Sequence, residues 1–94
     1  MNKSELEEAL SKKLTLPLDT AKSIIATILD SMTDTLVNGE NIEIRGFGSF
    51  TVKHYNSYIG RNPKTGKEVV VKEKRLPFFK VGKELKKAVD GGRK

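Results

Sequence analysis

The chain has 94 residues, a formal net charge of +6 and 36% hydrophobic residues, which together predict one small, basic, folded domain. It contains no cysteine, which excludes disulfide bonds, thiolate metal sites and cysteine nucleophiles. The N-terminus is polar and acidic and the longest apolar runs have about three residues, so we expect no secretory signal or membrane span and a cytoplasmic location.

The charges divide the chain into two halves. Residues 1–40 carry four Lys and seven Asp or Glu, a net charge of −3, whereas residues 41–94 carry fourteen Lys or Arg and five Asp or Glu, a net charge of +9. Such asymmetry indicates a half that binds a polyanion and a half with another task. The alternative is a solvated basic face that only keeps the protein soluble.

Two amphipathic helices are expected in the acidic half. Ser4 and Glu7 have the spacing of a capping box, and apolar residues recur behind them at helical spacing. Pro17 interrupts this pattern and suits the start of a second helix. The second apolar stripe covers residues 21–37, and Gly39 supplies a left-handed stop. We interpret both stripes as structural core in a helical hairpin or V.

Beyond residue 41 the apolar pattern changes to the alternation of strands. Residues 42–45 predict a first strand, and a longer extended segment covers residues 49–59. Turn-forming residues fill positions 60–67, and a third strand is expected from residue 69 towards residue 79. Pro77 in that segment indicates an edge strand or a kink.

A short last helix is expected after Gly82, with Leu85, Ala88 and Val89 facing inward. The fold class is therefore α+β: a two-helix base, a three-stranded antiparallel sheet and a C-terminal helix. The second and third strands exceed the first by roughly ten residues each, which predicts a ribbon about 30 Å long. An isolated ribbon is marginally stable in water, so this arm is expected to move until a partner holds it.

Motifs for catalysis or metal binding are missing. The Gly60–Lys67 segment differs from a phosphate-binding loop in its glycine spacing, in Glu68 where Ser or Thr is required, and in leading to a strand. His54 is the only histidine, and we interpret it as a surface residue of a strand, with a contact to a phosphate or a base edge as the alternative. We therefore predict that the protein is not an enzyme and holds no metal or cofactor.

Nucleic-acid binding fits the pattern better. Cations distributed along an extended ribbon can follow a phosphate backbone and release counterions. Pro63 at the ribbon's tip is a rigid apolar ring without an N–H, which suits a wedge between base pairs, with Arg61 and Asn62 beside it. The Asn62-Pro63 pair equally suits a simple turn. The basic residues that the charge pattern places on the ribbon or near its base are Lys53, Arg61, Lys64, Lys67, Lys72, Lys74, Arg75, Lys80, Lys83, Lys86 and Lys87.

Three segments of the chain resemble a known family. Residues 42–50 read IEIRGFGSF, residues 60–66 read GRNPKTG and residues 79–85 read FKVGKEL. They are similar to the bacterial HU/integration host factor family of DNA-bending proteins, and the likeness spans essentially residues 1–90. Minor-groove insertion of apolar wedges is the general mechanism of such proteins.

The resemblance implies an intertwined dimer with two arms that embrace double-stranded DNA through the minor groove and intercalate Pro63. It implies a helical dimerisation base (1–40), a sheet and DNA-binding arm (41–80) and a C-terminal helix with a basic tail (81–94). Phe47, Phe50 and Phe79 would be buried across the dimer. The residues that it assigns to the DNA path are Lys3, Arg45, Gly46, Gly48, Lys53, Arg61, Asn62, Lys64, Lys80, Lys83 and Lys86.

The chain departs from the family pattern in several places. Tyr55 and Tyr58 replace the arginines common in HU-type arms and offer apolar or stacking contacts with sugars. Arg45, with Glu43 before it, resembles the integration host factor beta type and suggests some sequence preference. The basic tail Arg93-Lys94 matches nothing in the family pattern.

The resemblance leaves the particular role open. An HU-type member would organise the nucleoid, whereas an integration host factor type subunit would act in recombination and transcription. The dimer partner is an identical chain or a paralogue. Two other classes remain as alternatives: an RNA-binding module, which needs aromatic residues on a sheet face where only Tyr55 and Tyr58 are available, and a protein that adds strands to a partner, which the lysine density disfavours.

Overall fold

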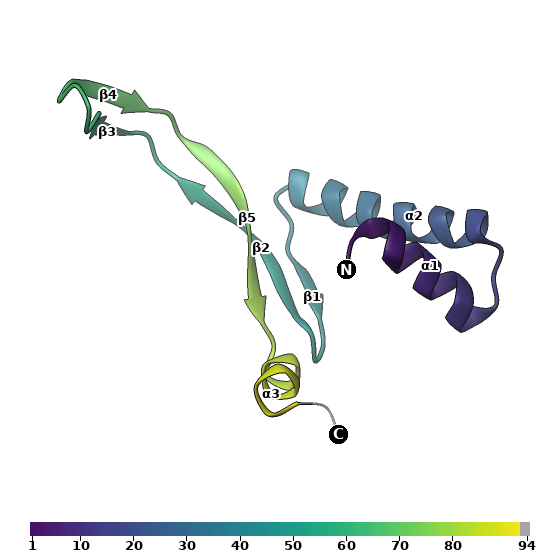
Figure 1. Cartoon of the computed structure of the whole chain (residues 1–94). Helices are drawn as coiled ribbons and strands as arrows, with labels where there is room; N and C mark the ends of the chain where they lie inside the picture. The colour runs from purple at the N-terminus through teal and green to yellow at the C-terminus, as the bar shows by residue number, and fades with distance from the viewer. Residues whose placement is uncertain (93–94) are drawn as a thin grey trace. The chain divides into compact units, whose positions relative to one another are not determined.

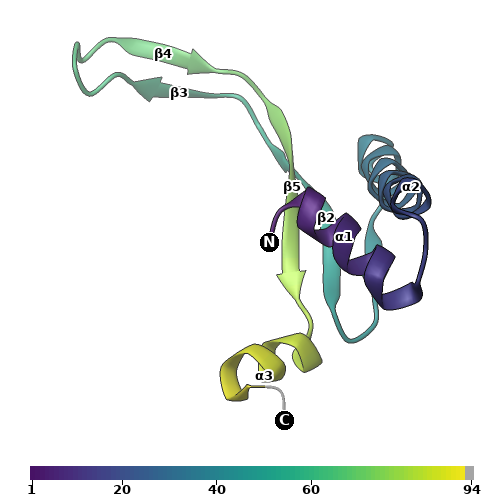
Figure 2. The same ribbon diagram turned by 45° about the vertical axis from the view of Figure 1, so that its right-hand side comes forward.

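The computed structural model describes residues 1–92. It divides into two compact units, Met1–Thr35 and the residues from Leu36 onward. The predicted basic tail, Arg93-Lys94, lies outside the described residues. The first unit contains α1 (Lys3–Leu14) and most of α2 (Leu18–Val37). A short loop joins them into the expected helical pair (Figures 1 and 2).

The predicted capping box at Ser4 and Glu7 is wrong by two residues. The N-cap is Asn2: its side chain accepts a hydrogen bond from the Glu5 N–H at 2.8 Å, and the Glu5 carboxylate accepts from the Asn2 N–H at 3.4 Å. Asn is as strong an N-cap as Ser, so the helix gains half a turn by beginning earlier. Glu7 instead points inward and is only 8% exposed.

The ends of α2 follow the sequence closely. The Pro17 carbonyl accepts from the Ala21 N–H at 3.1 Å, which places the proline directly before the first helical residue. At the other end Gly39 has φ +79° and donates to the Leu36 carbonyl at 3.0 Å, which confirms the left-handed stop. Ala21 and Ile25 are buried, but most other apolar residues of α2 stay partly exposed.

The second unit holds two antiparallel sheets. The larger has the strand order β1-β2-β5, formed by β1 (Ile42–Ile44), β2 (Gly48–Tyr55) and β5 (Lys74–Val81). The smaller pairs β3 (Tyr58–Arg61) with β4 (Glu68–Val71). We call β3, β4 and the turn between them the arm. β2 leads into β3 and β4 leads back into β5, so the arm continues the larger sheet outward (Figure 1).

The three predicted strands thus become five. Both long strands are interrupted at the same level, at Asn56-Ser57 on one side and at Lys72-Glu73 on the other. Asn and Ser have low strand propensity and neither pair of residues contributes to the ladder, so the sheet hydrogen bonding stops there and resumes in the arm. The α+β class and the antiparallel pairing are as predicted.

The larger sheet has a phenylalanine cluster on one side. Phe50 lies opposite Phe79 in the ladder, and the Phe79 ring lies 4.8 Å from the Phe50 ring and 5.6 Å from the Phe47 ring. Pro77, opposite Val52, lies in the edge strand β5, which confirms the predicted edge position. The aromatic cluster is therefore the centre around which the second unit is built.

The last helix, α3 (Lys83–Gly91), is held to the turn between β1 and β2. The Gly82 N–H donates to the Phe47 carbonyl at 2.8 Å, and the Leu85 N–H donates to the Gly46 carbonyl at 3.1 Å. Leu85 is half-buried as predicted, but Val89 is exposed. The inward placement of Val89 is wrong for this chain because these backbone bonds hold only the first turn of α3, and Val89 lies a turn beyond it. Figure 2 shows α3 at the end of β5 away from the arm.

Candidate nucleic-acid interface

The ladder between β2 and β5 sorts side chains onto two faces, because successive residues of a strand point to opposite sides and directly paired residues share a side. We name the inner face after the Phe50–Phe79 pair and the outer face after the Tyr55–Lys74 pair. The inner face comprises Ile42, Ile44, Gly48, Phe50, Val52, His54, Arg75, Pro77, Phe79 and Val81. The outer face comprises Glu43, Ser49, Thr51, Lys53, Tyr55, Lys74, Leu76, Phe78 and Lys80.

Three of the predicted DNA-binding lysines share the outer face. The Lys53 ammonium lies 3.6 Å from the centroid of the Phe78 ring, and the Lys74 ammonium lies 5.9 Å from the centroid of the Tyr55 ring. Lys80 follows at the end of the ladder nearest to α3, opposite Ser49. The outer face therefore combines exposed rings with the cations that a surface for a polyanion requires.

Arg75 is set apart from these lysines. It lies on the inner face, where its guanidinium donates to the carbonyl of Val37 at 3.0 Å and approaches Gly39. Val37 is the last residue of α2, and a cation at the carbonyl end of a helix is stabilised by the helix dipole. The structure thus brings Arg75 to a backbone carbonyl and not to the cations of the outer face.

The tip of the arm, residues 62–67, is a turn built by Asn62. Its side chain accepts from the Lys64 N–H at 2.9 Å, its carbonyl accepts from the Gly66 N–H at 2.7 Å and its N–H donates to the Lys67 carbonyl at 2.8 Å. Asn62 is half-buried, and its side-chain oxygen, N–H and carbonyl are all bonded within the turn, whereas Pro63 is exposed beside it. The asparagine therefore makes the hydrogen bonds that hold the turn, and the proline ring is free to contact a partner.

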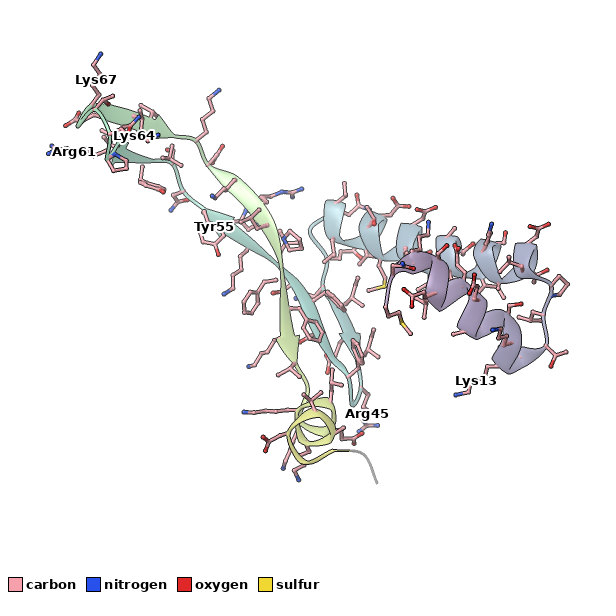
Figure 3. All side chains as sticks on the ribbon, in the orientation of Figure 1. Lys13, Arg45, Tyr55, Arg61, Lys64 and Lys67 are labelled. Carbon is pink, nitrogen blue, oxygen red and sulfur yellow. The ribbon has the colours of Figure 1, made fainter. Side chains whose placement is uncertain are left out.

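The arm is less evenly charged than the sequence pattern indicated. Figure 3 shows Arg61, Lys64 and Lys67 at its end. The paired strand residues behind the tip, Tyr58 to Gly60 and Val69 to Val71, are uncharged, and most are exposed. The cations thus form one group at the tip and another at the root, where Lys72 and Lys74 follow β4. An apolar shaft separates the two groups.

Arg45 lies in the turn between β1 and β2, beside a shallow hollow of about 280 Å³. Glu43, Lys80 and Gly82 also line this hollow. Gly46 has φ +83°, a left-handed conformation that favours glycine, and a Cβ there would also require the Glu84 carboxylate to move. A Cβ on Gly48 would lie 2.6 Å from the Phe79 ring. These two glycines therefore shape the turn that presents Arg45.

The remaining predicted residues lie on helices. Lys83 and Lys86 are exposed on α3, and Lys83 directly follows the hollow's Gly82. Lys3 is the first residue of α1 in the first unit. Within residues 1–92, no group of three or more His, Cys, Asp or Glu residues could hold a metal ion. In the same range no helix has both the length and the apolar character that crossing a bilayer requires.

Sequence reasoning missed two features of this surface. Phe78 was given no role, although its ring lies on the outer face with the lysines, and Arg75 was grouped with the arm cations. Strict alternation counted from Phe79 would have revealed both faces, because Phe78 and Phe79 are neighbours in a strand and cannot point to the same side.

The fold and its basic surface are those of a bacterial DNA-binding protein. The family model described as bacterial DNA-binding protein matches residues 1–90. The chain is 52% identical over 91 residues to the integration host factor subunit beta of Ralstonia nicotianae, covering 96% of this chain and 66% of that one. It is 48% identical to the subunit beta of Haemophilus influenzae strain PittGG, covering 96% and 97% of the two chains.

Comparison with solved structures indicates the same family as these sequence relatives. In an Anabaena HU–DNA cocrystal structure, the HU chain superposes with a TM-score of 0.85 at 30% identity, covering 95% of this chain and 97% of that one. HU from Thermotoga maritima gives a TM-score of 0.68 at 35% identity, covering 95% and 98%. The chain belongs to the HU/integration host factor family, whose members are DNA-binding architectural proteins and not enzymes.

Proposed function

We propose that two copies of this fold bind double-stranded DNA, enter its minor groove with their arms and bend it by inserting Pro63 between base pairs. The observation that carries this proposal is the tip. Pro63 is exposed at the end of the arm, on a turn that Asn62 fixes by three hydrogen bonds. A rigid apolar ring on a fixed turn is what wedging between stacked base pairs requires.

The charge around the wedge supports the same role. Unstacking a base step costs a few kcal/mol, which contacts to the bent flanks must offset. Arg61, Lys64 and Lys67 lie beside the proline, and the outer face of the sheet continues the cationic surface. Bent DNA that follows both groups of cations would gain the phosphate contacts that an unbent duplex lacks. In this proposal the DNA path includes Lys3, Arg45, Gly46, Gly48, Lys53, Asn62, Lys72, Lys74, Lys80, Lys83 and Lys86.

The incompletely buried apolar surface of the single chain supports the dimer in this proposal. Phe47 and Phe79 keep 45% and 39% of their surface exposed, although they form the centre of the second unit. Several large apolar residues of α2 are similarly exposed. Apolar surface of this extent is normally covered by a partner. We therefore assign residues 1–40 to a dimerisation base, 41–80 to the sheet and arm, and 81–94 to the C-terminal helix and tail. The partner is an identical chain or a paralogue.

Two roles in the bacterial cytoplasm are consistent with this chemistry. Binding without sequence preference would serve organisation of the nucleoid. A sequence-preferring subunit acting in recombination and transcription is favoured by one observation: Glu43 and Arg45 line the same hollow at the sheet's edge. A carboxylate beside an arginine can restrict the guanidinium to one pose, and arginine is the side chain most used to read bases.

The test is a comparison of bending and binding in Pro63→Ala. Bending is measured by energy transfer between dyes at the two ends of a duplex, and binding by anisotropy at low salt. We expect the bend to be largely lost while the affinity falls less, because phosphate contacts remain. Pro77→Ala is the matched control, since that proline lies in the edge strand β5 and should leave the bend unchanged. Equal loss of bending in both variants, or full bending by Pro63→Ala, would contradict the wedge.

A further inference from the structure

The apolar shaft of the arm exposes two large side chains on one of its faces. Ile59 is 67% and Val70 is 74% exposed, more than Tyr58 or Val69 beside them. Ile59 and Val70 lie directly opposite each other in the β3–β4 ladder, so their side chains share one face of the arm. Neither residue belongs to the proposed DNA path. An apolar pair so open to water indicates a surface that meets an apolar partner.

Cations bracket this apolar pair at both ends of the arm. Three lie at the tip and two follow β4 at the root: Arg61, Lys64 and Lys67 (Figure 3), and Lys72 and Lys74. Residues 58–74 carry five Lys or Arg and two Glu, a net charge of +3. Clustered cations are attracted to anionic lipid headgroups, and apolar side chains beside them can enter the boundary of the acyl chains.

We propose that the arm binds the surface of an anionic lipid bilayer, with Ile59 and Val70 at the acyl boundary and the flanking cations on headgroup phosphates. A bilayer presents charge in one plane and apolar chains beneath it, which matches an apolar shaft between two cationic ends. A second protein copy fits less well, because a stable interface buries about 800 Å² on each partner and two side chains cannot supply that area. The contact is separate from duplex bending and does not depend on Pro63.

The dimensions of the arm determine how it would lie. β3 and β4 have four residues each, a length of about 13 Å at roughly 3.3 Å per residue, whereas the hydrocarbon layer is about 30 Å thick. The arm therefore lies in the interface and does not cross it. Each strand of this two-stranded sheet has one unpaired edge, whose backbone groups must stay at the depth of water and headgroups. Only the face of Ile59 and Val70 enters, and its one carboxylate, Glu68, lies opposite Arg61, which offsets the repulsion.

The experiment measures sedimentation of the protein with vesicles of phosphatidylglycerol or phosphatidylcholine, and anisotropy of a labelled duplex. The double variant Ile59→Thr/Val70→Thr keeps the branched side chains that suit a strand and makes the face polar. We expect it to bind phosphatidylglycerol vesicles about tenfold more weakly, while its affinity for the duplex changes less than about twofold. The matched control is Val69→Thr/Val71→Thr, which makes the same kind of change on the other face of the arm and should alter vesicle binding less than about twofold.

Four outcomes would overturn the proposal. The wild type could fail to bind phosphatidylglycerol vesicles, or bind both kinds of vesicle equally. The Ile59→Thr/Val70→Thr variant could bind vesicles as the wild type does, or no more weakly than the control variant. It could also lose as much affinity for the duplex as for vesicles, which would assign this face to DNA. Each outcome can be observed while duplex bending persists, so this proposal and the proposed function fail independently. Thermal unfolding of every variant confirms that the chain still folds.

Discussion

Phe78 and Phe79 are adjacent, of one residue type and almost equally exposed in the single chain, at 42% and 39%. They nevertheless belong to two different surfaces. Phe79 packs against Phe50 and Phe47 on the inner face, whereas Phe78 lies beneath the Lys53 ammonium on the outer face. Exposure alone therefore does not distinguish an unfinished core from a binding surface. The side chains that surround each ring distinguish the two surfaces.

The comparison extends along the whole ladder between β2 and β5. Val52 and Lys53 are neighbours on opposite faces, and so are Lys74 and Arg75. The inner face collects apolar groups, His54 and one arginine that donates a hydrogen bond to a backbone carbonyl. The outer face collects lysines with free ammonium groups beside rings. We infer that the inner face serves assembly of the dimer and that the outer face serves binding of DNA. The same substitution made at two neighbouring positions should therefore affect stability on the inner face and DNA binding on the outer face.

The largest difference is expected between Phe79→Ala and Phe78→Ala. Removing the Phe79 ring takes away the contacts that link Phe50 and Phe47, and truncation of a core phenylalanine costs about 3–5 kcal/mol. Since Phe79 is only partly buried in the single chain, we expect about 3 kcal/mol less unfolding free energy in the assembled protein. Phe78→Ala should lower it by less than about 1 kcal/mol, the scale of a surface cation–ring contact.

Urea unfolding at several protein concentrations measures both variants. If the inner face is the dimer interface, the loss in Phe79→Ala grows as the protein is diluted, because assembly contributes to the stability. The Phe78→Ala transition should show only the concentration dependence of the wild type. Equal losses in the two variants would show that the two faces do not differ in the way the ladder indicates.

A second difference is expected between the neighbouring cations of β5. Lys74→Gln should reduce the slope of log affinity against log salt by about 0.9 for each substituted subunit, because each loses one phosphate contact, and should leave the unfolding free energy nearly unchanged. Arg75→Gln should leave the slope unchanged and reduce the unfolding free energy by about 1 kcal/mol, since it removes a charge-assisted hydrogen bond at a helix end. Salt titrations of duplex binding and thermal unfolding measure the two quantities. A smaller slope in Arg75→Gln would place its guanidinium on DNA.

The sequence predicted more of the fold than of the surface. Apolar periodicity located both helices of the first unit, and the Gly39 stop and the Pro77 edge position follow from backbone chemistry that each residue carries by itself. The segment 60–66 is one of the three that indicated the family, and the turn that it begins depends on contacts within six residues of the chain. Local rules succeed where the relevant partners are close in sequence.

The predictions failed where the interacting residues are far apart in the sequence, or where two nearby residues are equally suited to one position. The hydrogen bond from Arg75 to the Val37 carbonyl joins residues 38 positions apart, and no local sequence pattern predicts it. Asn2 and Ser4 are comparable N-caps, so the choice between them depends on whether Glu7 is turned inward. Two consecutive phenylalanines are equally apolar, and only the register of β2 against β5 assigns one to each face.

The smallest expected difference uses the neighbours Thr51 and Val52, whose side chains have nearly the same shape. Val52 faces Pro77 on the inner face and Thr51 faces Phe78 on the outer face, and both are half-buried. Val52→Thr places a hydroxyl among apolar groups and should cost about 1 kcal/mol, because that hydroxyl has no partner on the inner face. Thr51→Val should change the unfolding free energy by less than about 0.5 kcal/mol, since the hydroxyl that it removes lies on a face open to water.

Because the two substitutions exchange the same atoms between neighbouring positions, urea unfolding of the pair compares the faces without any change of volume. A larger cost for Thr51→Val than for Val52→Thr would mean that the outer face, and not the inner one, is covered in the assembled protein.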